Sequence, residues 1–526
     1  MSKFDRSMRL NRRWFLRGLA FAGGAALFSN LTQFTSLVRA QTEEAASNSA
    51  DLLKELESIP NPGRPLKVVI LGAGMAGLSA AIELEKRGHT CVILEADRSH
   101  IGGRVRTLRF EDGLYGDLGA MRIPKTHTLT RHYIDLCGLE LRPFVSNNPE
   151  AYYYMRSGRV RVKDADKLPQ IYSLSGSESE LTPDDVWDIV VENRLDKLSE
   201  EEKAEIFAEY PQSAAIREMD EQSFLQWCKV SQLSDDALEM MLTARGLSDL
   251  IDSSALSIIR LEENLKNDLE EIVGGMDLLP TVLASLLKSK PRMGCEVIGL
   301  ERDDEAQKAT AIYRESGTIK REEGDFVLCT IPFPVLSRLN TPFSGSKQRA
   351  IRELFYESSV KVLALANRRF WEADDGIYGG GTYSDLPIAT TYYPNDNARA
   401  KDPEVSASPG VMLASYSWGS RARRLGDLRP RKRHEVVQQA LGLIHPQINE
   451  NGVLQRMESW NWDNHRWSQG AFTFMKPYQQ LGLYKDVIAP EGRIYFAGEH
   501  ASIQFAWIEG AVESSLRAVR EMLLST

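Results

Sequence analysis

The chain has 526 residues, of which 42% are hydrophobic and 26% charged, with a formal net charge of −9. This composition is that of a globular protein long enough for two or three sub-domains with sizeable cores, and no internal repeat or low-complexity tract is evident. Because an acidic body repels the phosphate backbone, we exclude nucleic acid as a partner.

The first forty residues differ from the rest of the chain. "NRRWFLRGLAFAGGAALF" places Arg12 and Arg13 before an apolar run softened by glycine, and Val38 and Ala40 form a small-residue cleavage pattern. We interpret residues 1–40 as a twin-arginine signal peptide, which predicts export to the periplasm or beyond the cell. The alternative is an N-terminal membrane anchor that stays uncut.

Residues 41–65 are expected to form a helix and a linker that ends in "NPGRP". The segment that follows, "LKVVILGAGMAGLSAAIELEKRGHTCVILEA", predicts a buried strand, a glycine turn, an Ala-rich helix and a second strand. Gly72, Gly74 and Gly77 fit G-x-G-x-x-G, which supplies a tight turn, a close approach to a pyrophosphate and close helix-to-strand packing. A turn of purely structural glycines is the alternative.

Glu95 ends the second predicted strand, where a carboxylate accepts both ribose hydroxyls of an adenosine and disfavours a 2′-phosphate. Next, "ADRSHIGGRVRT" adds a second glycine pair, Gly102 and Gly103, followed by Arg104. A further backbone approach with a cation suits the second phosphate and the flavin end of FAD better than a nicotinamide. We therefore predict FAD, with Met75, Ala76 and Ala96 also in contact with it.

Two motifs resemble those of a known family. "LEADRSHIGGRVRT" is similar to the signature of flavin-containing amine oxidases, and "GRIYFAGEHASIQFAWIEGAVESSLRA" is similar to their closing motif. The resemblance covers roughly residues 66 to 520 and is weakest in the middle. It implies an α/β fold with a Rossmann-like FAD-binding domain of the glutathione-reductase/amine-oxidase type, a mixed α+β substrate domain and a helical insert.

The expected FAD-binding domain is assembled from residues 66–125, 266–345 and 456–526. Residues 126–265 contain segments with helical periodicity, such as "DDVWDIVVENRLDKLSEEEKAEIF", and are expected to form a helical substrate-access domain. Residues 346–455 are expected to form a substrate-binding domain of strands and a helix.

The resemblance also assigns cofactor contacts near the C-terminus. A residue at Val297 in "CEVIGL" meets the adenine, and Glu499 in "AGE" holds the ribityl-pyrophosphate region, although an ordinary cap or salt-bridge acid is the alternative. A helix that starts near Trp507 and Ile508 points its amides at the flavin pyrimidine. The segment "GAMRIP" supplies four further predicted contacts, from Gly119, Ala120, Met121 and Arg122.

Lys361 lies within the strand-like segment "SSVKVLALANRRFW". A lysine surrounded by apolar residues is desolvated, which lowers its pKa and makes it a candidate for proton handling. In the resembling enzymes the matching lysine holds a water against flavin N5. The alternative is a lysine on an edge strand whose amine extends to solvent.

Arg122 interrupts a small and apolar segment, so its guanidinium is expected to need an anionic partner. "GAMRIP" closely resembles the segment of snake-venom-type L-amino acid oxidases in which this arginine binds the substrate carboxylate, and "LASYSWGS" places Tyr416 where a tyrosine hydroxyl helps. Trp507 would form a wall beside the substrate amine, and the carbonyl of Ala506, where the family often has glycine, would accept its hydrogen bond. An Arg122 paired with a protein acid or a flavin phosphate is the alternative.

Further aromatic walls are expected from Trp460, Trp462 and Trp467, unless these are core residues. No cysteine lies in "EHASIQFAW", where monoamine oxidases attach flavin covalently, so the FAD should be non-covalent. The five cysteines have no paired spacing and are expected to be free thiols. The eight histidines have no metal-ligand spacing, and no metal site is expected.

These predictions combine into FAD-dependent oxidative deamination of L-amino acids to 2-oxo acids, with release of ammonia and hydrogen peroxide. The expected partners are an L-amino acid, O₂ and the twin-arginine export machinery, and a homodimer is one assembly that the sequence allows. Lys361, Arg122, Tyr416 and Trp507 are the catalytic candidates. The alternatives are a polyamine or monoamine oxidase, an amino-acid 2-monooxygenase, an exported flavoprotein dehydrogenase with a membrane acceptor, and a flavin-binding protein without turnover.

Overall fold

The computed structural model describes residues 52–526. The predicted signal peptide, and the first part of the helix and linker predicted over residues 41–65, lie outside the described residues. Residues 52–58 form the described part of that helix. Among the described helices, none combines the length and the apolar character that a membrane span requires.

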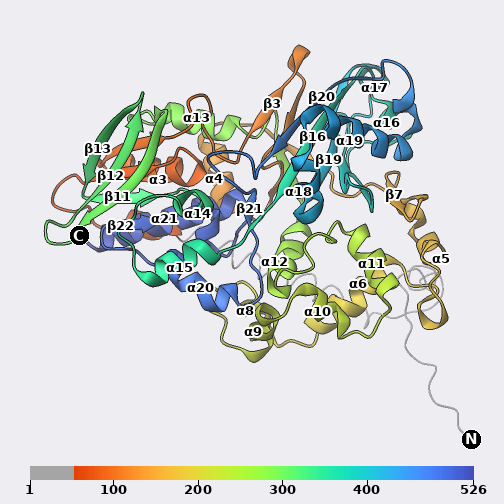
Figure 1. The fold of residues 1–526 in the computed structure, drawn as a ribbon, viewed down its shortest axis with the longest axis horizontal. Coiled ribbons are helices and arrows are strands. Elements are labelled where there is room, and N and C mark those ends of the chain that lie inside the picture. Colours follow the sequence, from red (N-terminus) through yellow and green to blue (C-terminus); the bar gives the residue numbers. More distant parts are fainter. Residues whose placement is uncertain (1–51) are drawn as a thin grey trace, which may run out of the picture. The chain divides into compact units, whose positions relative to one another are not determined.

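A five-stranded parallel sheet forms the centre of the first half of the fold (Figure 1). Its order is β10-β2-β1-β14-β22, so neighbouring strands come from distant parts of the chain. The strands are β1 (Lys67–Leu71), β2 (Thr90–Glu95), β10 (Arg292–Met293), β14 (Phe326–Cys329) and β22 (Ile494–Phe496). β1, β2, β14 and β22 are largely continuous apolar runs, because both faces of the sheet are covered.

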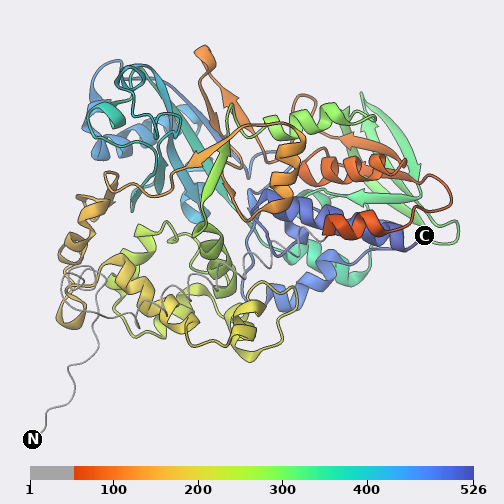
Figure 2. The same ribbon diagram turned by 180° about the vertical axis from the view of Figure 1, so that it is seen from behind.

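Four helices cover one face of this sheet, and α3 and α21 lie side by side there (Figure 2). They are α3 (Met75–Lys86), α4 (Thr128–Leu136), α13 (Leu278–Leu286) and α21 (Ile508–Leu524). Val68 and Ile70 of β1 point into this layer, whereas Val69 and Leu71 point to the opposite face. Because side chains alternate along a strand, β1 contributes to the hydrophobic core on each face of the sheet.

The opposite face packs against a three-stranded antiparallel sheet and three helices. These elements are β11 (Cys295–Asp303), β12 (Lys308–Glu315), β13 (Thr318–Gly324), α14 (Phe333–Leu336), α15 (Gly345–Glu353) and α20 (Gln479–Ile488).

A seven-stranded sheet, in the order β20-β16-β19-β18-β17-β7-β8, forms the second half (Figure 1). Its strands are β7 (Tyr152–Met155), β8 (Gly158–Arg161), β16 (Ser359–Ala366), β17 (Gly381–Ser384), β18 (Thr390–Tyr392), β19 (Gly410–Trp418) and β20 (Leu454–Asn461). Four helices accompany them: α16 (Phe370–Ala373), α17 (Pro403–Ala407), α18 (Gly419–Asp427) and α19 (Pro430–Ile444).

Two strands of the seven-stranded sheet lie on the N-terminal side of the range 346–455 that was expected to form the substrate-binding domain, and a third crosses the boundary at residue 455. β7 and β8 lie within residues 126–265, where helices were expected, and β7 pairs with β17 of the seven-stranded sheet. β20 extends that sheet beyond residue 455 by pairing with β16. In both cases the strand belongs to the seven-stranded sheet because its backbone pairs with a strand far away in the chain. No local sequence pattern indicates such a pairing.

Most of residues 165–265 are helical and form a separate layer below the seven-stranded sheet in Figure 1. The helices are α5 (Leu168–Ile171), α6 (Pro183–Trp187), α7 (Asn193–Leu195), α8 (Glu200–Glu205), α9 (Ala214–Glu221), α10 (Phe224–Lys229), α11 (Asp235–Ala244) and α12 (Ala255–Leu265). Serine and threonine caps begin several of them: Thr182, Ser199, Ser223, Ser234 and Ser254 each accept a bond from a backbone amide of the first turn.

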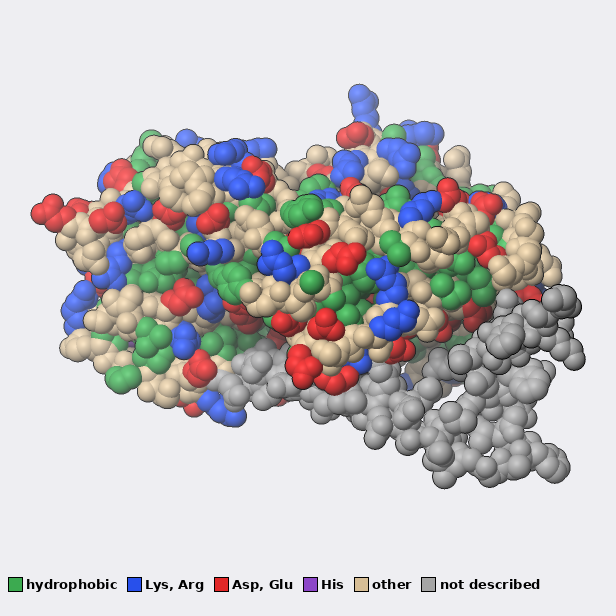
Figure 3. Space-filling view, turned by 90° about the horizontal axis from the view of Figure 1, so that it is seen from below, with side chains coloured by type: hydrophobic (Ala, Val, Ile, Leu, Met, Phe, Trp, Pro, Cys, Tyr) green, Lys and Arg blue, Asp and Glu red, His purple; other side chains and the backbone are tan. Residues whose placement is uncertain are grey.

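Small sheets join these layers. β3 (Thr107–Arg109) pairs with β4 (Tyr115–Asp117), β15 (Tyr356–Glu357) with β21 (Phe472–Thr473), and β9 (Leu269–Ile272) with both β5 (Ile123–Pro124) and β6 (Leu141–Phe144). The expected mixed helix-and-sheet fold class is confirmed. On the face in Figure 3, acidic and basic side chains are interspersed with apolar ones.

Candidate active site

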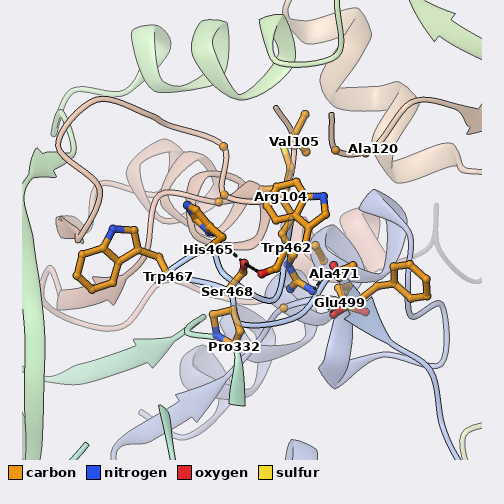
Figure 4. Close-up of a pocket in the computed structure, with 18 of the residues that line it drawn as sticks. Arg104, Val105, Ala120, Pro332, Trp462, His465, Trp467, Ser468, Ala471 and Glu499 are labelled. Carbon is orange, nitrogen blue, oxygen red and sulfur yellow. Dashed lines mark hydrogen bonds and ion pairs between the residues drawn. The ribbon is translucent and has the colours of Figure 1, made fainter. Parts of the chain in front are cut away.

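One cavity runs from the β1–α3 turn to the start of α21. Figure 4 shows part of its wall. Segments from both halves of the fold line it, including residues 119–122, strands β16 and β19, and the stretch 462–474. The predicted site residues on its wall are Gly72, Gly74, Met75, Ala76, Glu95, Ala96, Gly103, Arg104, Gly119, Ala120, Met121, Arg122, Val297, Lys361, Tyr416, Glu499, Ala506, Trp507 and Ile508. The fold thus gathers positions that are more than four hundred residues apart into one continuous surface.

The β1–α3 turn forms one end of the cavity. Gly72 has a φ of 110°, in the region that favours glycine, and Gly74 caps α3 without a side-chain hydrogen bond. Met75 and Ala76, the first residues of α3, line the cavity, so this helix presents its N-terminal amides to the space. Such a terminus attracts a phosphate.

Gly77 is the one predicted cofactor contact that does not line the cavity. A Cβ atom at this position would lie 2.1 Å from the carbonyl oxygen of Gly72. The residue therefore acts through close packing of α3 on the turn, which explains why glycine stands there.

Glu95 lies beside this turn and is buried. Its carboxylate accepts hydrogen bonds at 2.7 Å from the amides of Ala73 and of Asp97. Burial raises its pKa, and these two backbone bonds oppose that effect. The carboxylate also faces the cavity, where it can accept ribose hydroxyls, with Val297 on the neighbouring wall.

Arg104 and Glu499 form an ion pair at 2.5 Å in the middle of the cavity (Figure 4). Glu499 also accepts the amide of Ala506 at 2.8 Å and that of Thr473 at 3.2 Å. It is thus a salt-bridge acid, as in the alternative interpretation, and at the same time part of the cavity wall. This pair ties the segment after the second glycine pair to the C-terminal motif.

A second helix N-terminus opens into the cavity at α21. Trp507 is its N-cap, with no side-chain capping bond, and Ile508 and Ala511 line the space. Ala506, just before it, has a φ of 67°, a conformation that glycine adopts without strain. A glycine at this position would adopt the same backbone conformation without that strain.

These features fit a flavin dinucleotide. Two uncapped helix N-termini stand at separate points of one cavity, with a buried carboxylate near the first and a buried Arg–Glu pair between them. The terminus of α3 suits a pyrophosphate, Glu95 suits a ribose, and the terminus of α21 suits a pyrimidine that becomes negative on reduction.

Lys361 lies on β16, an interior strand between β20 and β19, and is 1% exposed. The alternative of an edge-strand lysine that reaches solvent is therefore wrong. Its Nζ donates to the carbonyls of Asp117 at 3.1 Å and Gly119 at 2.7 Å, and to the Met121 sulfur at 3.1 Å. Burial lowers its pKa, as the sequence predicted.

Tyr416 stands directly opposite Lys361 in the β16–β19 register, and the Lys361 amine lies 4.5 Å from its ring centroid. Arg122 approaches the same region from the segment before β5. Within residues 52–526 its guanidinium forms one side-chain hydrogen bond, to the Tyr392 hydroxyl at 3.2 Å, and no ion pair. A pairing of Arg122 with an acid in this part of the chain is thus excluded.

Three residues near the site escaped sequence reasoning. Tyr392 lies on β18, next to β19, and holds Arg122. His127 is buried edge-on against Trp507, with 5.1 Å between ring centroids, and its Nε2 bonds the Asn264 side-chain oxygen at 3.2 Å. The third is Asp117, whose carbonyl accepts from the Lys361 amine. None stands in a motif, and only the tertiary contacts reveal them.

The tryptophans of "ESWNWDNHRWSQGAF" divide into two groups. Trp462 and Trp467 line the cavity, near His465 and Ser468 (Figure 4), and the Trp462 indole donates to the Leu118 carbonyl at 3.0 Å. Trp460 is outside the lining and packs under the Arg106 guanidinium, 4.2 Å from it. Two of the three predicted walls are therefore present.

All five cysteines are free thiols, four of them buried. Residues 52–526 contain no cluster of three or more histidine, cysteine and acidic side chains that could hold a metal ion.

The chain is similar to proteins of known activity over most of its length. Residues 75–523 match the model of the family described as flavin containing amine oxidoreductase. An L-amino-acid oxidase from Pseudechis australis is 30% identical over 504 residues, covering 92% of each chain. A flavin-dependent L-tryptophan oxidase, RebO, from Lentzea aerocolonigenes is 35% identical over 483 residues, covering 86% of this chain and 97% of that one.

Solved structures of putrescine oxidase share the fold. The wild-type enzyme bound to putrescine superimposes with a TM-score of 0.69 at 20% identity, covering 88% of this chain and 100% of that one. At this identity the likeness concerns architecture alone.

Proposed function

The chain belongs to the flavin-containing amine oxidoreductase family, and we propose that it is a flavin-dependent L-amino acid oxidase, which converts an L-amino acid, O₂ and water into a 2-oxo acid, ammonia and hydrogen peroxide. The resemblance inferred from the two terminal motifs is thus confirmed. The names of the relatives support this activity. A protein named L-amino-acid oxidase and one named flavin-dependent L-tryptophan oxidase match this chain over 92% and 86% of its length.

The observation that carries this proposal is the state of Arg122. Its half-buried guanidinium lines the cavity with a tyrosine hydroxyl as its side-chain partner and no carboxylate from the described part of the chain. A desolvated guanidinium makes a short, bidentate pair with a carboxylate. A substrate with an α-carboxylate completes this site, whereas a simple amine leaves the charge unmatched.

We propose FAD, bound without a covalent link, as the cofactor. The terminus of α3 and Glu95 would hold its adenosine diphosphate part, and Arg104, Glu499 and the terminus of α21 its flavin part. No cysteine lies between Glu499 and Trp507. When bound, the flavin would accept a hydride, that is two electrons and a proton, from the substrate Cα–H bond while the amine loses a proton, and would pass two electrons and two protons to O₂ to give hydrogen peroxide.

The protein's own residues provide binding, orientation and charge. Arg122 and Tyr416 hold the carboxylate, and the Ala506 carbonyl and the Trp507 ring hold the amine. Two fixed ends leave the Cα–H bond one orientation in the cavity. The Lys361 amine, surrounded by the 117–121 segment, supplies a buried proton-handling group beside this position.

A peroxide-coupled screen tests the assignment. The purified flavoprotein is offered the twenty L-amino acids, selected D-amino acids, putrescine and simple amines. We expect rapid release of peroxide, ammonia and a 2-oxo acid from L-amino acids, and at most slow turnover of putrescine and the simple amines. Putrescine or a simple amine turned over as fast would favour an amine oxidase, an amide product a 2-monooxygenase, and flavin reduction without peroxide a dehydrogenase.

For localisation we propose export by the twin-arginine pathway. Arg12 and Arg13 before a glycine-softened apolar run support it. That pathway carries folded proteins, which suits a flavoprotein with five free cysteines. Replacing both arginines by lysine should retain the protein in the cytoplasm, whereas unchanged export would contradict the proposal.

A further inference from the structure

The guanidinium of Arg122 has one side-chain partner among residues 52–526, and this partner stands outside the wall of the cavity. Nη1 of Arg122 donates to the Tyr392 hydroxyl at 3.2 Å. A guanidinium carries five N–H donors in one plane, so most of them remain for other acceptors. A bidentate pair with a carboxylate uses two donors on one edge of that plane. Because the bond to Tyr392 fixes one end of the plane, it also sets the direction in which the free edge points.

The hydroxyl of Tyr392, rather than its ring face, makes this contact. The guanidinium carbon of Arg122 lies 5.7 Å from the ring centroid, which is near the limit of a cation–π contact. The hydroxyl oxygen is within hydrogen-bond distance of Nη1, and a hydrogen bond to a charged group is stronger than one between neutral groups. Removal of the hydroxyl alone should therefore release the guanidinium.

The seven-stranded sheet fixes the ring of Tyr392. Tyr392 ends β18 and stands opposite Gly381 of β17 and Leu413 of β19. A Cβ atom at Gly381 would lie 2.9 Å from Cε1 of this ring and 3.3 Å from Cδ1, so the ring lies directly over the glycine. The Phe144 ring also packs against it, with 5.9 Å between ring centroids. Since the ring is buried and closely packed, its hydroxyl has little freedom to move.

Tyr392 and Arg122 line different cavities. Arg122 lines the cavity described above, whereas Tyr392 lines a second, smaller one together with Leu363 and Leu413. Met121, the residue before Arg122, lies on the wall of both. A substrate in the first cavity thus meets the guanidinium of Arg122 and not the Tyr392 hydroxyl. Any effect of this hydroxyl on a substrate must pass through Arg122.

We propose that Tyr392 is a positioning residue for the substrate carboxylate: its hydroxyl, fixed by the packing of its ring on the sheet, aims the guanidinium of Arg122 into the first cavity. The inference rests on the proposed function, because the carboxylate is that of an L-amino acid. Loss of the hydroxyl should weaken binding of the carboxylate and leave the amine end, at Ala506 and Trp507, unaffected.

The first experiment compares Tyr392→Phe with the wild type, since this substitution keeps the ring over Gly381 and removes the hydroxyl alone. Anaerobic stopped-flow reduction of the flavin by the best L-amino acid gives a dissociation constant and a limiting rate. We expect the dissociation constant to rise about tenfold and the limiting rate to stay within about twofold. The corresponding amine without a carboxylate should behave as it does with the wild type.

Tyr393→Phe is the matched control. Tyr393 is the next residue in the chain, but its side chain packs on the opposite face of the sheet, and its hydroxyl bonds Thr382 and His445 at 2.7 Å. Flavin content and melting temperature check the folding of both variants. An unchanged dissociation constant in Tyr392→Phe, an equal rise in Tyr393→Phe, or an equal rise for the amine would each overturn the proposal.

A second experiment needs no turnover. Benzoate carries a carboxylate but no amine, and its binding to the oxidised flavoprotein is followed by flavin absorbance. We expect a dissociation constant about tenfold higher in Tyr392→Phe than in the wild type or Tyr393→Phe, and no binding in Arg122→Leu. Equal benzoate affinities in the wild type and Tyr392→Phe, or a wild type that binds no benzoate, would overturn the proposal. If no L-amino acid reduces the flavin, the proposed function fails, while this titration still decides the role of Tyr392.

Discussion

The two ends of the cavity differ in the groups that line them, backbone at one end and buried charged side chains at the other. At the β1–α3 turn the wall is backbone: glycines, a helix terminus and a carboxylate already bonded to two amides. At the other end the wall carries buried charges, Lys361 and Arg122, held by carbonyls and by tyrosines. We therefore expect an added side-chain atom to impair flavin binding at the first end, and the loss of a charge to impair substrate turnover at the second.

Gly77→Ala should have the largest effect. The new Cβ would lie 2.1 Å from the Gly72 carbonyl oxygen and 3.2 Å from the Ile70 side chain, and since the first of these is a backbone atom, the turn must shift. We expect a loss of about 3 kcal/mol or more in unfolding free energy, and most of the bound flavin with it. Flavin absorbance and thermal unfolding measure both.

Gly482→Ala is the matched control, because Gly482 also lies within a helix, α20, but a Cβ added there would have no heavy atom within 4 Å. It should be neutral or stabilising by up to about 1 kcal/mol. Equal effects of the two substitutions would show that close packing at Gly77 is not the cause.

Arg122→Leu should break the charged end while leaving the nucleotide end intact. We expect normal flavin content and a fall of about 1000-fold in kcat/KM for the best L-amino acid, the loss expected from two hydrogen bonds to a carboxylate. The internal control is the amine that corresponds to this amino acid without its carboxylate. Its slow turnover should be the same in Arg122→Leu and in the wild type. Unchanged steady-state kinetics with the amino acid would refute the clamp.

Lys361→Met should have a smaller effect on the same end. Removing a buried proton-handling group should slow flavin reduction or reoxidation by about 100-fold, with substrate affinity nearly intact. Stopped-flow absorbance follows both half-reactions. Traces that superimpose on those of the wild type would remove Lys361 from the mechanism.

Ala506→Gly should have the smallest effect. Ala506 lines the cavity directly before the N-terminus of α21. The substitution relieves a left-handed backbone conformation but gives the unfolded chain more freedom, so unfolding free energy should rise by about 0 to 1 kcal/mol. The carbonyl that we assign to the amine stays in place, and KM should change little. A clear fall in melting temperature would mean that the Ala506 methyl group contributes packing that outweighs the strain.

Sequence reasoning succeeded where the information is local. The glycine turn, Glu95 at the end of β2 and the helix that starts after Trp507 each depend on a few consecutive residues, and the structure has them as expected. The lowered pKa of Lys361 was also predictable, because an apolar strand on both sides of a lysine implies burial.

The expected domain boundaries and three neighbours of the site were beyond such reasoning. β7 and β20 join the seven-stranded sheet through pairing with strands far away in the chain. His127 meets Trp507, and Tyr392 meets Arg122, across hundreds of residues. Contacts of this kind depend on how layers pack, and no spacing in the chain encodes them.

By itself the sequence determined that this protein has a glycine turn between a buried strand and a helix, and the closing motif of its family, and it predicted that Arg122 needs an anion, because backbone conformation and desolvation act on neighbouring residues. The tertiary structure alone decided that Arg122 meets no protein carboxylate in the described chain and that the main-chain carbonyls of Asp117 and Gly119 hold the Lys361 amine. A charge depends on everything within a few ångströms of it, and at this site those atoms come from strands more than two hundred residues apart.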